Sequence, residues 1–262
     1  MTVEQALGGA GIDAREARLL LAAATGFSEV AVLAFPERDL PAEAATRFHS
    51  FVRRRAMGEP VAYILGRKEF YGLELAVTPA VLIPRPETEL LVELALERRF
   101  DSLLDLGTGS GAVALAVKKH RPAARVVAVE ASAAALAVAK RNAVKLGLAV
   151  ELLHGRWLEP LAGERFDVIV SNPPYVAQGD SHLADLRYEP PSALVAGRDG
   201  LGAIREIARQ APAHVAPGGW LLLEHGMGQD AVVRGLLAAA GLESVQSWPD
   251  LAGIPRASGG RR

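Results

Sequence analysis

From residue 102 onward, short apolar segments alternate with segments of helical pattern, and this alternation restricts the possible folds more than any other feature. The segments SLLDLG, RVVAVE, VELLHG, FDVIVSN and GGWLLLE are typical of buried strands. Strands that alternate with helices form a mainly parallel sheet with helices on both faces. We therefore expect an α/β fold with its ligand site at the carboxyl edge of the sheet.

The first part of the chain has a different character and predicts a separate helical domain. A run of Leu and Ala residues that ends at Gly26, and a second segment that begins at Pro41, are rich in helix formers. From Gly58 to Glu89, Gly, Pro and alternating apolar residues suggest a hairpin-like connector. We also expect the last residues, SGGRR, to fray. The predicted domains are a helical domain at 1–75, a hairpin connector at 76–87 and a larger domain at 88–262.

Composition excludes several classes of function. The chain of 262 residues has no cysteine, which rules out disulfide scaffolds, thiolate metal sites and cysteine nucleophiles. Six scattered histidines lack the spacing of metal ligands, so no metal is expected. The net charge of -1 argues against binding nucleic acid by bulk electrostatics. No signal-peptide pattern and no run of about 18 apolar residues occurs, so we expect a cytoplasmic protein without a membrane span.

The turn after the first predicted strand reads DLGTGSGA, residues 105–112. Its glycines let the backbone turn tightly and approach a ligand closely. Gly107, Gly109 and Ala112 fit a permissive dinucleotide fingerprint. Asp105 and the three glycines give DxGxGxG, which resembles motif I of class I S-adenosylmethionine methyltransferases. Glu130 ends the next strand, where a carboxylate can accept hydrogen bonds from ribose hydroxyls. The loop alone leaves a methyltransferase, an NAD enzyme and a structural turn as alternatives.

A second motif, Asn172-Pro173-Pro174-Tyr175, follows the strand FDVIVS. Two prolines stiffen the backbone and remove two N–H donors. The Asn172 side-chain oxygen and the Pro173 carbonyl can together accept both hydrogens of a planar NH2 group, and Tyr175 can stack on it. Holding such a nitrogen towards an electrophilic methyl group relies on orientation and electrostatics rather than on a metal or a strong base.

Together the two motifs and the segment GEPVAYILGRKEFYGLELAVTPAVLIPRPETELLVE resemble the HemK/PrmC family of release-factor glutamine methyltransferases, over nearly the whole chain. The resemblance implies a transferase that methylates protein and acts in translation termination. It would move a methyl group from S-adenosylmethionine to the side-chain amide nitrogen (N5) of the glutamine in the Gly-Gly-Gln motif of peptide chain release factors. No nucleic acid, membrane or metal partner is implied.

The resemblance also assigns residues to roles. The catalytic residues would be Asn172, Pro173 and Tyr175, and the helical domain would dock the release factor. Substrate would be held by Asn172, Pro173, Pro174, Tyr175 and Arg85. The cofactor would be bound by Gly107, Thr108, Gly109, Ser110, Gly111, Glu130, Trp157 and Asn172.

Two positions depart from the family pattern. Glu130 stands where the family usually has Asp, which keeps the charge but adds one methylene group. Arg156 stands before Trp157, where the family usually has an acid that could accept from the adenine amino group. Arg has only donors, so we expect a weaker adenine contact, a backbone substitute, or an Arg156 that points to solvent.

Other functions stay open at this stage. An adenine-N6 DNA methyltransferase also handles a planar amino group, but it needs a DNA-binding surface that this chain's charge does not suggest. A glutamine methyltransferase acting on a ribosomal protein would share the same core. A non-catalytic cofactor-binding adaptor and an NAD enzyme are the alternatives from other classes.

Overall fold

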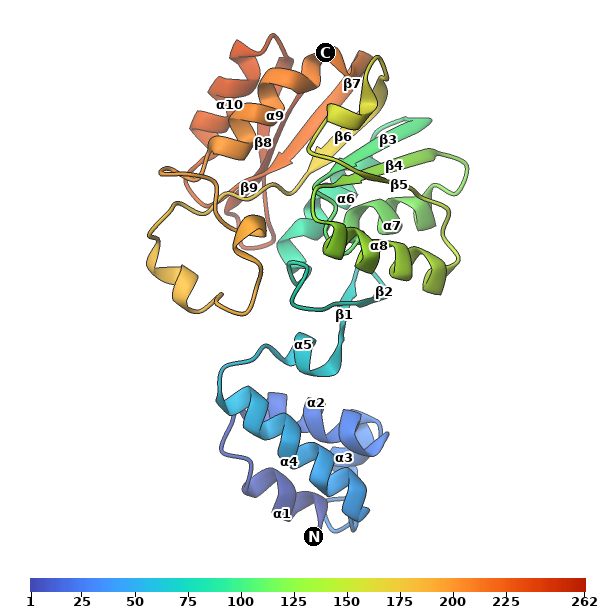
Figure 1. Ribbon diagram of the computed structural model, residues 1–262, viewed down its shortest axis with the longest axis vertical. Helices are drawn as coiled ribbons and strands as arrows, with labels where there is room; N and C mark the ends of the chain where they lie inside the picture. Colours follow the sequence, from blue (N-terminus) through green and yellow to red (C-terminus); the bar gives the residue numbers. More distant parts are fainter. The chain divides into compact units, whose positions relative to one another are not determined.

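The computed structural model describes residues 1–262, which divide into two compact units, Met1–Arg67 and Lys68–Arg262. The smaller unit is entirely helical (Figure 1). Leu20, Leu21 and Phe48 lie at the centre of its own apolar core. Side chains of Thr2, Asp13 and Ser28 cap three of the helices by accepting backbone N–H bonds, as their sequence positions favour. The helices are α1 (Val3–Gly8), α2 (Ala14–Thr25), α3 (Glu29–Ala34), α4 (Ala42–Ala56) and α5 (Val61–Leu65).

The hairpin lies within the segment 58–89 that suggested it, but before the bounds 76–87 that we assigned to the connector. Strands β1 (Arg67–Phe70) and β2 (Leu73–Ala76) form a two-stranded sheet, so residues 67–76 are not part of a helical domain that runs to residue 75. The structure places the connector 76–87 after this hairpin, where it has no regular strand. The reason is packing: Phe70, Leu73 and Leu75 are buried in the core of the larger unit and bring the hairpin with them.

The larger unit is built on a seven-stranded sheet in the order β5-β4-β3-β6-β7-β9-β8. The first five strands of that order pair in parallel, and β9 pairs antiparallel with both of its neighbours. The predicted mainly parallel sheet is therefore confirmed. The strands are β3 (Ser102–Leu106), β4 (Arg125–Glu130), β5 (Glu151–His154), β6 (Phe166–Ser171), β7 (Val215–Glu224), β8 (Glu243–Pro249) and β9 (Pro255–Arg261).

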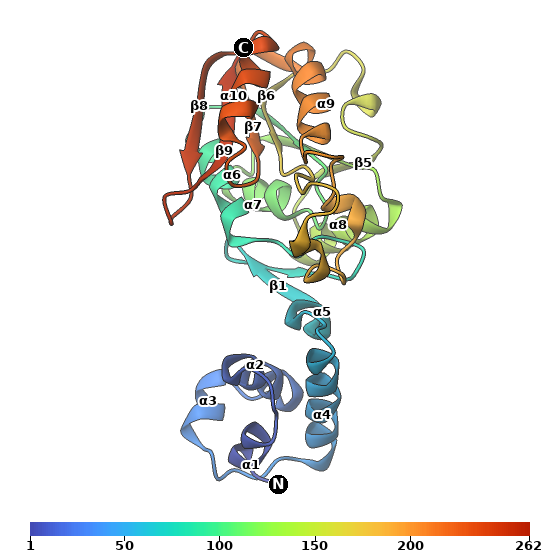
Figure 2. The same ribbon diagram turned by 90° about the vertical axis from the view of Figure 1, so that its left-hand side faces the viewer.

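Helices cover both faces of this sheet, as the alternating pattern predicts (Figures 1 and 2). Alternate residues of each strand serve the two cores: Leu103 packs with α6 and α7, whereas Leu104 packs with α9 and α10. One face carries α6 (Glu89–Leu96), α7 (Ala112–His120) and α8 (Ala133–Leu146), and the other carries α9 (Gly202–Gln210) and α10 (Asp230–Ala239). Short 3-10 turns are η1 (Pro86–Thr88), η2 (Glu159–Leu161), η3 (Ser181–Ala184), η4 (Pro191–Ala193) and η5 (Ala211–Ala213).

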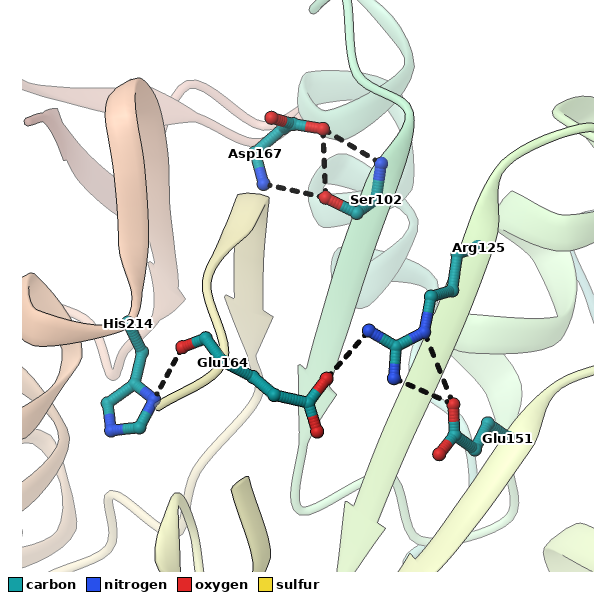
Figure 3. Close-up of polar contacts among 6 residues, drawn as sticks. All are labelled: Ser102, Arg125, Glu151, Glu164, Asp167 and His214. Atoms are coloured by element: carbon teal, nitrogen blue, oxygen red, sulfur yellow. Dashed lines mark hydrogen bonds and ion pairs between the residues drawn. The ribbon is translucent and has the colours of Figure 1, made fainter. Parts of the chain in front are cut away.

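Polar contacts tie the strands together at the amino edge of the sheet (Figure 3). The Asp167 carboxylate accepts from the backbone N–H of Ser102 at 2.9 Å and from its hydroxyl at 2.8 Å, which joins β6 to β3. Arg125 on β4 donates to Glu151 at 2.9 Å and to Glu164 at 2.7 Å. These polar side chains bond to one another at the amino edge of the sheet. The residues predicted for the site lie at the opposite, carboxyl edge.

The C-terminal residues form the buried strand β9, so our expectation that SGGRR frays is wrong. Adding a Cβ at Gly259 would place it 2.6 Å from the carbonyl oxygen of Leu221 on β7. At Gly260 the same atom would lie 2.9 Å from the Cβ of Leu242. Close packing therefore requires glycine at these positions. Because the strand consists mostly of small residues, it lacks the alternating apolar pattern by which a strand is predicted from sequence.

We predict that Gly259→Ala lowers the free energy of unfolding by about 1–3 kcal/mol, because backbone cannot retreat from the added methyl group. Urea unfolding followed by circular dichroism measures this. Gly235→Ala is the matched control: no atom lies within 4 Å of its added Cβ on α10, so the variant should gain about 0.5–1 kcal/mol. Equal stability of both variants would contradict the packing argument.

Candidate active site

The register of the central strands brings the two sequence motifs side by side. Leu106, the last residue of β3, pairs with Ser171 on β6 and with Val129 on β4. The glycine loop that starts at Gly107 and the motif that starts at Asn172 therefore leave the sheet from adjacent strands. This is the edge and the strand junction where open α/β sheets bind ligands.

A buried carboxylate holds the glycine loop in shape. Asp105 is 2% exposed and accepts a 2.6 Å hydrogen bond from the Thr108 hydroxyl and a 3.2 Å bond from the Ala114 N–H. Burial raises the pKa of the Asp105 carboxyl to about 6, although both bonds act in the opposite direction. The backbone of Gly107 has φ +72°, and a Cβ there would lie 3.1 Å from the Trp157 ring. The loop thus depends on glycine both for its turn and for close approach to an aromatic ring.

Glu130 lies beside this loop, as expected for a ligand carboxylate at the end of β4. One carboxylate oxygen accepts from the N–H of Gly109 at 2.9 Å, and the other accepts from the N–H of Ser132 at 2.8 Å. Each oxygen of an ionised carboxylate has a second acceptor site. The longer side chain of Glu therefore supports the loop and still has capacity for hydroxyl groups of a ligand.

Trp157 adopts a left-handed backbone conformation with φ 48°, which is unusual for a bulky residue. Its indole Nε1 is buried and has no partner that meets hydrogen-bond geometry. The nearby Glu206 carboxylate has a lowered pKa, chiefly through its bond with Arg156 and to a smaller degree through Trp157. A strained aromatic residue beside a cavity is a candidate ligand contact.

The guanidinium of Arg156 forms an ion pair with Glu206 on α9, although Arg156 is also one of the residues that line the cavity at this edge. Its Nε donates to Glu206 at 3.1 Å, and its Nη2 donates to the other carboxylate oxygen. The Arg156 side chain is 58% exposed. Of the three outcomes that the sequence left open, the structure thus favours an outward-facing Arg156.

The amide of Asn172 is held by Thr88. The Asn172 Nδ2 donates to the Thr88 hydroxyl oxygen at 2.9 Å, so the amide oxygen points away from Thr88. Tyr175, at the other end of the motif, donates its hydroxyl to Glu224 at 3.2 Å and accepts at its carbonyl from Gln229 at 3.1 Å. Burial and the neighbouring Glu224 carboxylate raise the pKa of Tyr175, so it keeps its proton.

Glu224 ends β7 and is 2% exposed. Burial raises the pKa of its carboxyl to about 7, against hydrogen bonding from Thr88 and Tyr175 that lowers it. Among charged neighbours, Glu87 raises this pKa and Arg256 lowers it. From the sequence, Glu224 ends the strand GGWLLLE and could therefore lie at the rim of the pocket, but a polar pair at a strand end, without a role in the site, was the favoured interpretation.

Arg85, predicted to contact substrate, is bonded to Glu189, which is 4% exposed. The other oxygen of Glu189 accepts from the backbone N–H of Ile83 at 2.9 Å. This pair anchors the long segment 172–201 that follows β6. Gly200 closes that segment, and a Cβ there would clash with the carbonyl oxygen of Tyr175.

These elements enclose a cavity of about 430 Å³ at the carboxyl edge, within the size range of small-molecule sites. Thr88 lines it, although the sequence analysis did not single that residue out. Of the residues predicted for the site, Gly111, Pro173 and Tyr175 are not among those that line the cavity. The predicted residues that do line it are Arg85, Gly107, Thr108, Gly109, Ser110, Glu130, Trp157, Asn172 and Pro174.

No group of three or more His, Asp or Glu side chains is arranged to hold a metal ion. None of the helices combines the length and the apolar character needed to cross a membrane.

Comparison with known proteins decides between the alternatives. Residues 2–66 match the family described as PrmC N-terminal domain, and residues 86–187 match the family described as Methyltransferase small domain. A release factor glutamine methyltransferase of Burkholderia pseudomallei is 51% identical and aligns with 99% of this chain and 96% of its own length. A release factor glutamine methyltransferase of Neisseria gonorrhoeae is 48% identical and aligns with 100% of this chain and 98% of its own length. This chain belongs to the family of release factor glutamine methyltransferases.

Solved structures agree on the fold. A methyltransferase from Pyrococcus furiosus has a TM-score of 0.58 at 21% identity and covers 80% of this chain and 96% of its own. A 16S rRNA N2 G1207 methyltransferase of T. thermophilus, solved with AdoMet and guanosine, has a TM-score of 0.56 at 24% identity. The match covers 75% of this chain and 49% of that one. The predictions of a class I methyltransferase fold and of an S-adenosylmethionine-dependent protein-glutamine methyltransferase are confirmed. The DNA and ribosomal-protein alternatives are not favoured.

We predict that Glu224→Gln changes the pH dependence of stability. Because the pKa is raised from 4.5 to about 7 in the folded protein, wild type loses stability as pH rises through this window, and the loss is complete above about pH 7. The amide has no such proton, so its advantage over wild type should grow by about 3 kcal/mol between about pH 4 and about pH 8. Urea unfolding at both pH values measures this, and a constant difference would contradict the raised pKa.

Proposed function

We propose that this protein methylates the N5 nitrogen of the glutamine in the Gly-Gly-Gln motif of peptide chain release factors, and that it does so in the cytoplasm, where translation takes place. The observation that carries the proposal is the juxtaposition of Asn172 with the glycine loop, on adjacent strands around one cavity. A frame for a planar amide therefore lies beside a frame for a nucleoside cofactor.

The residues of the cavity fit S-adenosylmethionine. A carboxylate with spare acceptor sites, Glu130, suits the two ribose hydroxyls. Trp157, with its ring against Gly107, offers an apolar face for the adenine. The backbone from Gly107 to Gly111 would hold the amino-acid portion. When bound, the cofactor supplies a methyl group that its sulfonium has already activated.

The protein would contribute orientation. Asn172 Oδ1 and the carbonyl oxygen of Pro173 would accept the two N–H bonds of the glutamine amide and turn its nitrogen towards the methyl group. Pro174 lines the cavity and Tyr175, fixed by Glu224, would close the side of the amide. An Asn side chain cannot take up a proton, so the proton that nitrogen loses would pass to water.

The helical unit, Met1–Arg67, would dock the release factor. Helix α3 supports this role, because it exposes the apolar side chains of Val30 (73%) and Leu33 (62%). Such side chains on a small helical unit suit a protein partner better than water.

The test is methylation of purified release factor with labelled S-adenosylmethionine, read by mass spectrometry of the Gly-Gly-Gln peptide. Wild type should add one methyl group to that glutamine, and a release factor with Gln→Ala in the motif should stay unlabelled. Asn172→Ala should lower kcat roughly 10²–10³-fold, because one of two oriented acceptors is lost. Equal labelling of the Gln→Ala substrate, or full activity of Asn172→Ala, would refute the assignment.

We further predict that Arg156→Ala binds S-adenosylmethionine with a Kd within about twofold of wild type, since the native side chain is 58% exposed and its guanidinium is engaged with Glu206. Isothermal titration measures both. Glu130→Ala is the comparison variant, and it should weaken binding at least about tenfold through loss of the hydrogen bonds to ribose. A strong effect of Arg156→Ala would show that the ion pair shapes the adenine site.

A further inference from the structure

The two ends of the Asn-Pro-Pro-Tyr motif depend on one buried carboxyl group. Glu224 follows Leu223, which pairs with Ser171, so Glu224 and Asn172 leave the sheet next to each other. Tyr175 donates its hydroxyl directly to Glu224 Oε1 at 3.2 Å. Asn172 donates to Thr88, whose hydroxyl lies close enough to the same carboxyl group to lower its pKa.

The second oxygen of Glu224, Oε2, is buried and lacks a partner at regular hydrogen-bond geometry. The Thr88 hydroxyl is close enough to lower the pKa of this carboxyl, although no regular hydrogen bond joins the two side chains. Burying an isolated carboxylate lowers the stability of the fold, and burying a neutral side chain of the same shape would lower it less. A purely structural role therefore does not account for an acid at this position.

An ionised carboxylate gives the hydrogen bonds a fixed direction, because it can only accept. A Thr88 O–H turned towards this carboxylate could only act as a donor, which leaves the Thr88 oxygen to accept from Asn172 Nδ2, as observed at 2.9 Å. The Asn172 amide is asymmetric, so this arrangement keeps its oxygen away from Thr88. A neutral donor in place of Glu224 would remove that restriction and allow the amide to rotate by half a turn.

We propose that Glu224 and Thr88 are positioning residues that orient the Asn172 amide so that its oxygen, and not its nitrogen, faces the glutamine of the substrate. The proposal rests on the function proposed above. It assigns the orientation of Asn172 to two residues from other parts of the chain, one at the end of β7 and one before α6. Glu224 itself does not line the cavity, so it acts through Asn172.

The test compares Glu224→Gln, Thr88→Val and Thr88→Ser with wild type, using intact release factor at about pH 8, where Glu224 is mostly ionised. Glu224→Gln keeps the shape and an acceptor for Tyr175 but introduces a donor towards Thr88. We expect kcat to fall roughly tenfold to a hundredfold in Glu224→Gln and in Thr88→Val, because the amide is misoriented. KM for release factor and the Kd for S-adenosylmethionine should stay within about twofold.

Thr88→Ser retains the hydroxyl and should recover kcat to within about threefold of wild type. Glu151→Gln is the matched control: it removes an acid from the far, amino edge of the same sheet and should leave kcat unchanged. Thermal unfolding of each variant excludes loss of fold, and Glu224→Gln should be at least as stable as wild type.

Three results would overturn the proposal: full kcat in Glu224→Gln, a Thr88→Ser variant as impaired as Thr88→Val, or a loss that appears in the cofactor Kd instead of kcat. These outcomes are distinct from failure of the proposed function, in which wild type itself would not methylate the Gly-Gly-Gln glutamine.

Discussion

The parallel pairing of β3 with β6 is the interaction on which the site depends. Because Leu106 pairs with Ser171, the glycine loop and the Asn-Pro-Pro-Tyr motif begin at the same level of the sheet, although 65 residues separate those partners in the sequence. The Ser171 hydroxyl adds a 2.7 Å bond to the carbonyl of Leu106. At the other end of the same two strands, Asp167 and Ser102 hold the register from the amino edge. A shift of one residue would turn every side chain to the opposite face and separate the two halves of the cavity.

Buried carboxyl groups then hold in place the loops that the strand register brings together. Asp105 holds the glycine loop, Glu189 holds the segment after β6 through Arg85, and Glu224 holds the amide-binding motif. Each is 4% exposed or less. Asp105 bonds within its own loop and helix, whereas Glu189 and Glu224 bond to residues that are distant in the sequence. Burial of such groups reduces stability, as the raised pKa values of Asp105 and Glu224 indicate. The site is therefore rigid at some expense to the stability of the fold.

Much of this arrangement could be predicted from local sequence. Strands β3 to β7 are apolar runs that end in glycine or polar residues, and the loops after them lie at one edge by the rules of parallel sheets. Thr88 and Glu189 could not be found in this way, because their roles come from contacts across 84 and 106 residues of sequence. Our predictions of the hairpin boundary and of a frayed C-terminal segment were wrong for a related reason. Phe70 joins a distant core and Gly259 fits a tight interstrand space, and neither residue has a local pattern that shows it.

Strand β9 has a consequence for how the chain acquires its fold. It follows β8 in the sequence but lies between β7 and β8 in the sheet. Until residues 255–261 have been synthesised, β8 has no neighbour in the sheet and β7 has a free edge, so the half of the sheet that carries Glu224 cannot close during earlier elongation. A nascent chain that contains β7 and β8 but not yet β9 would thus expose an unpaired strand edge, and the insertion of β9 removes that edge.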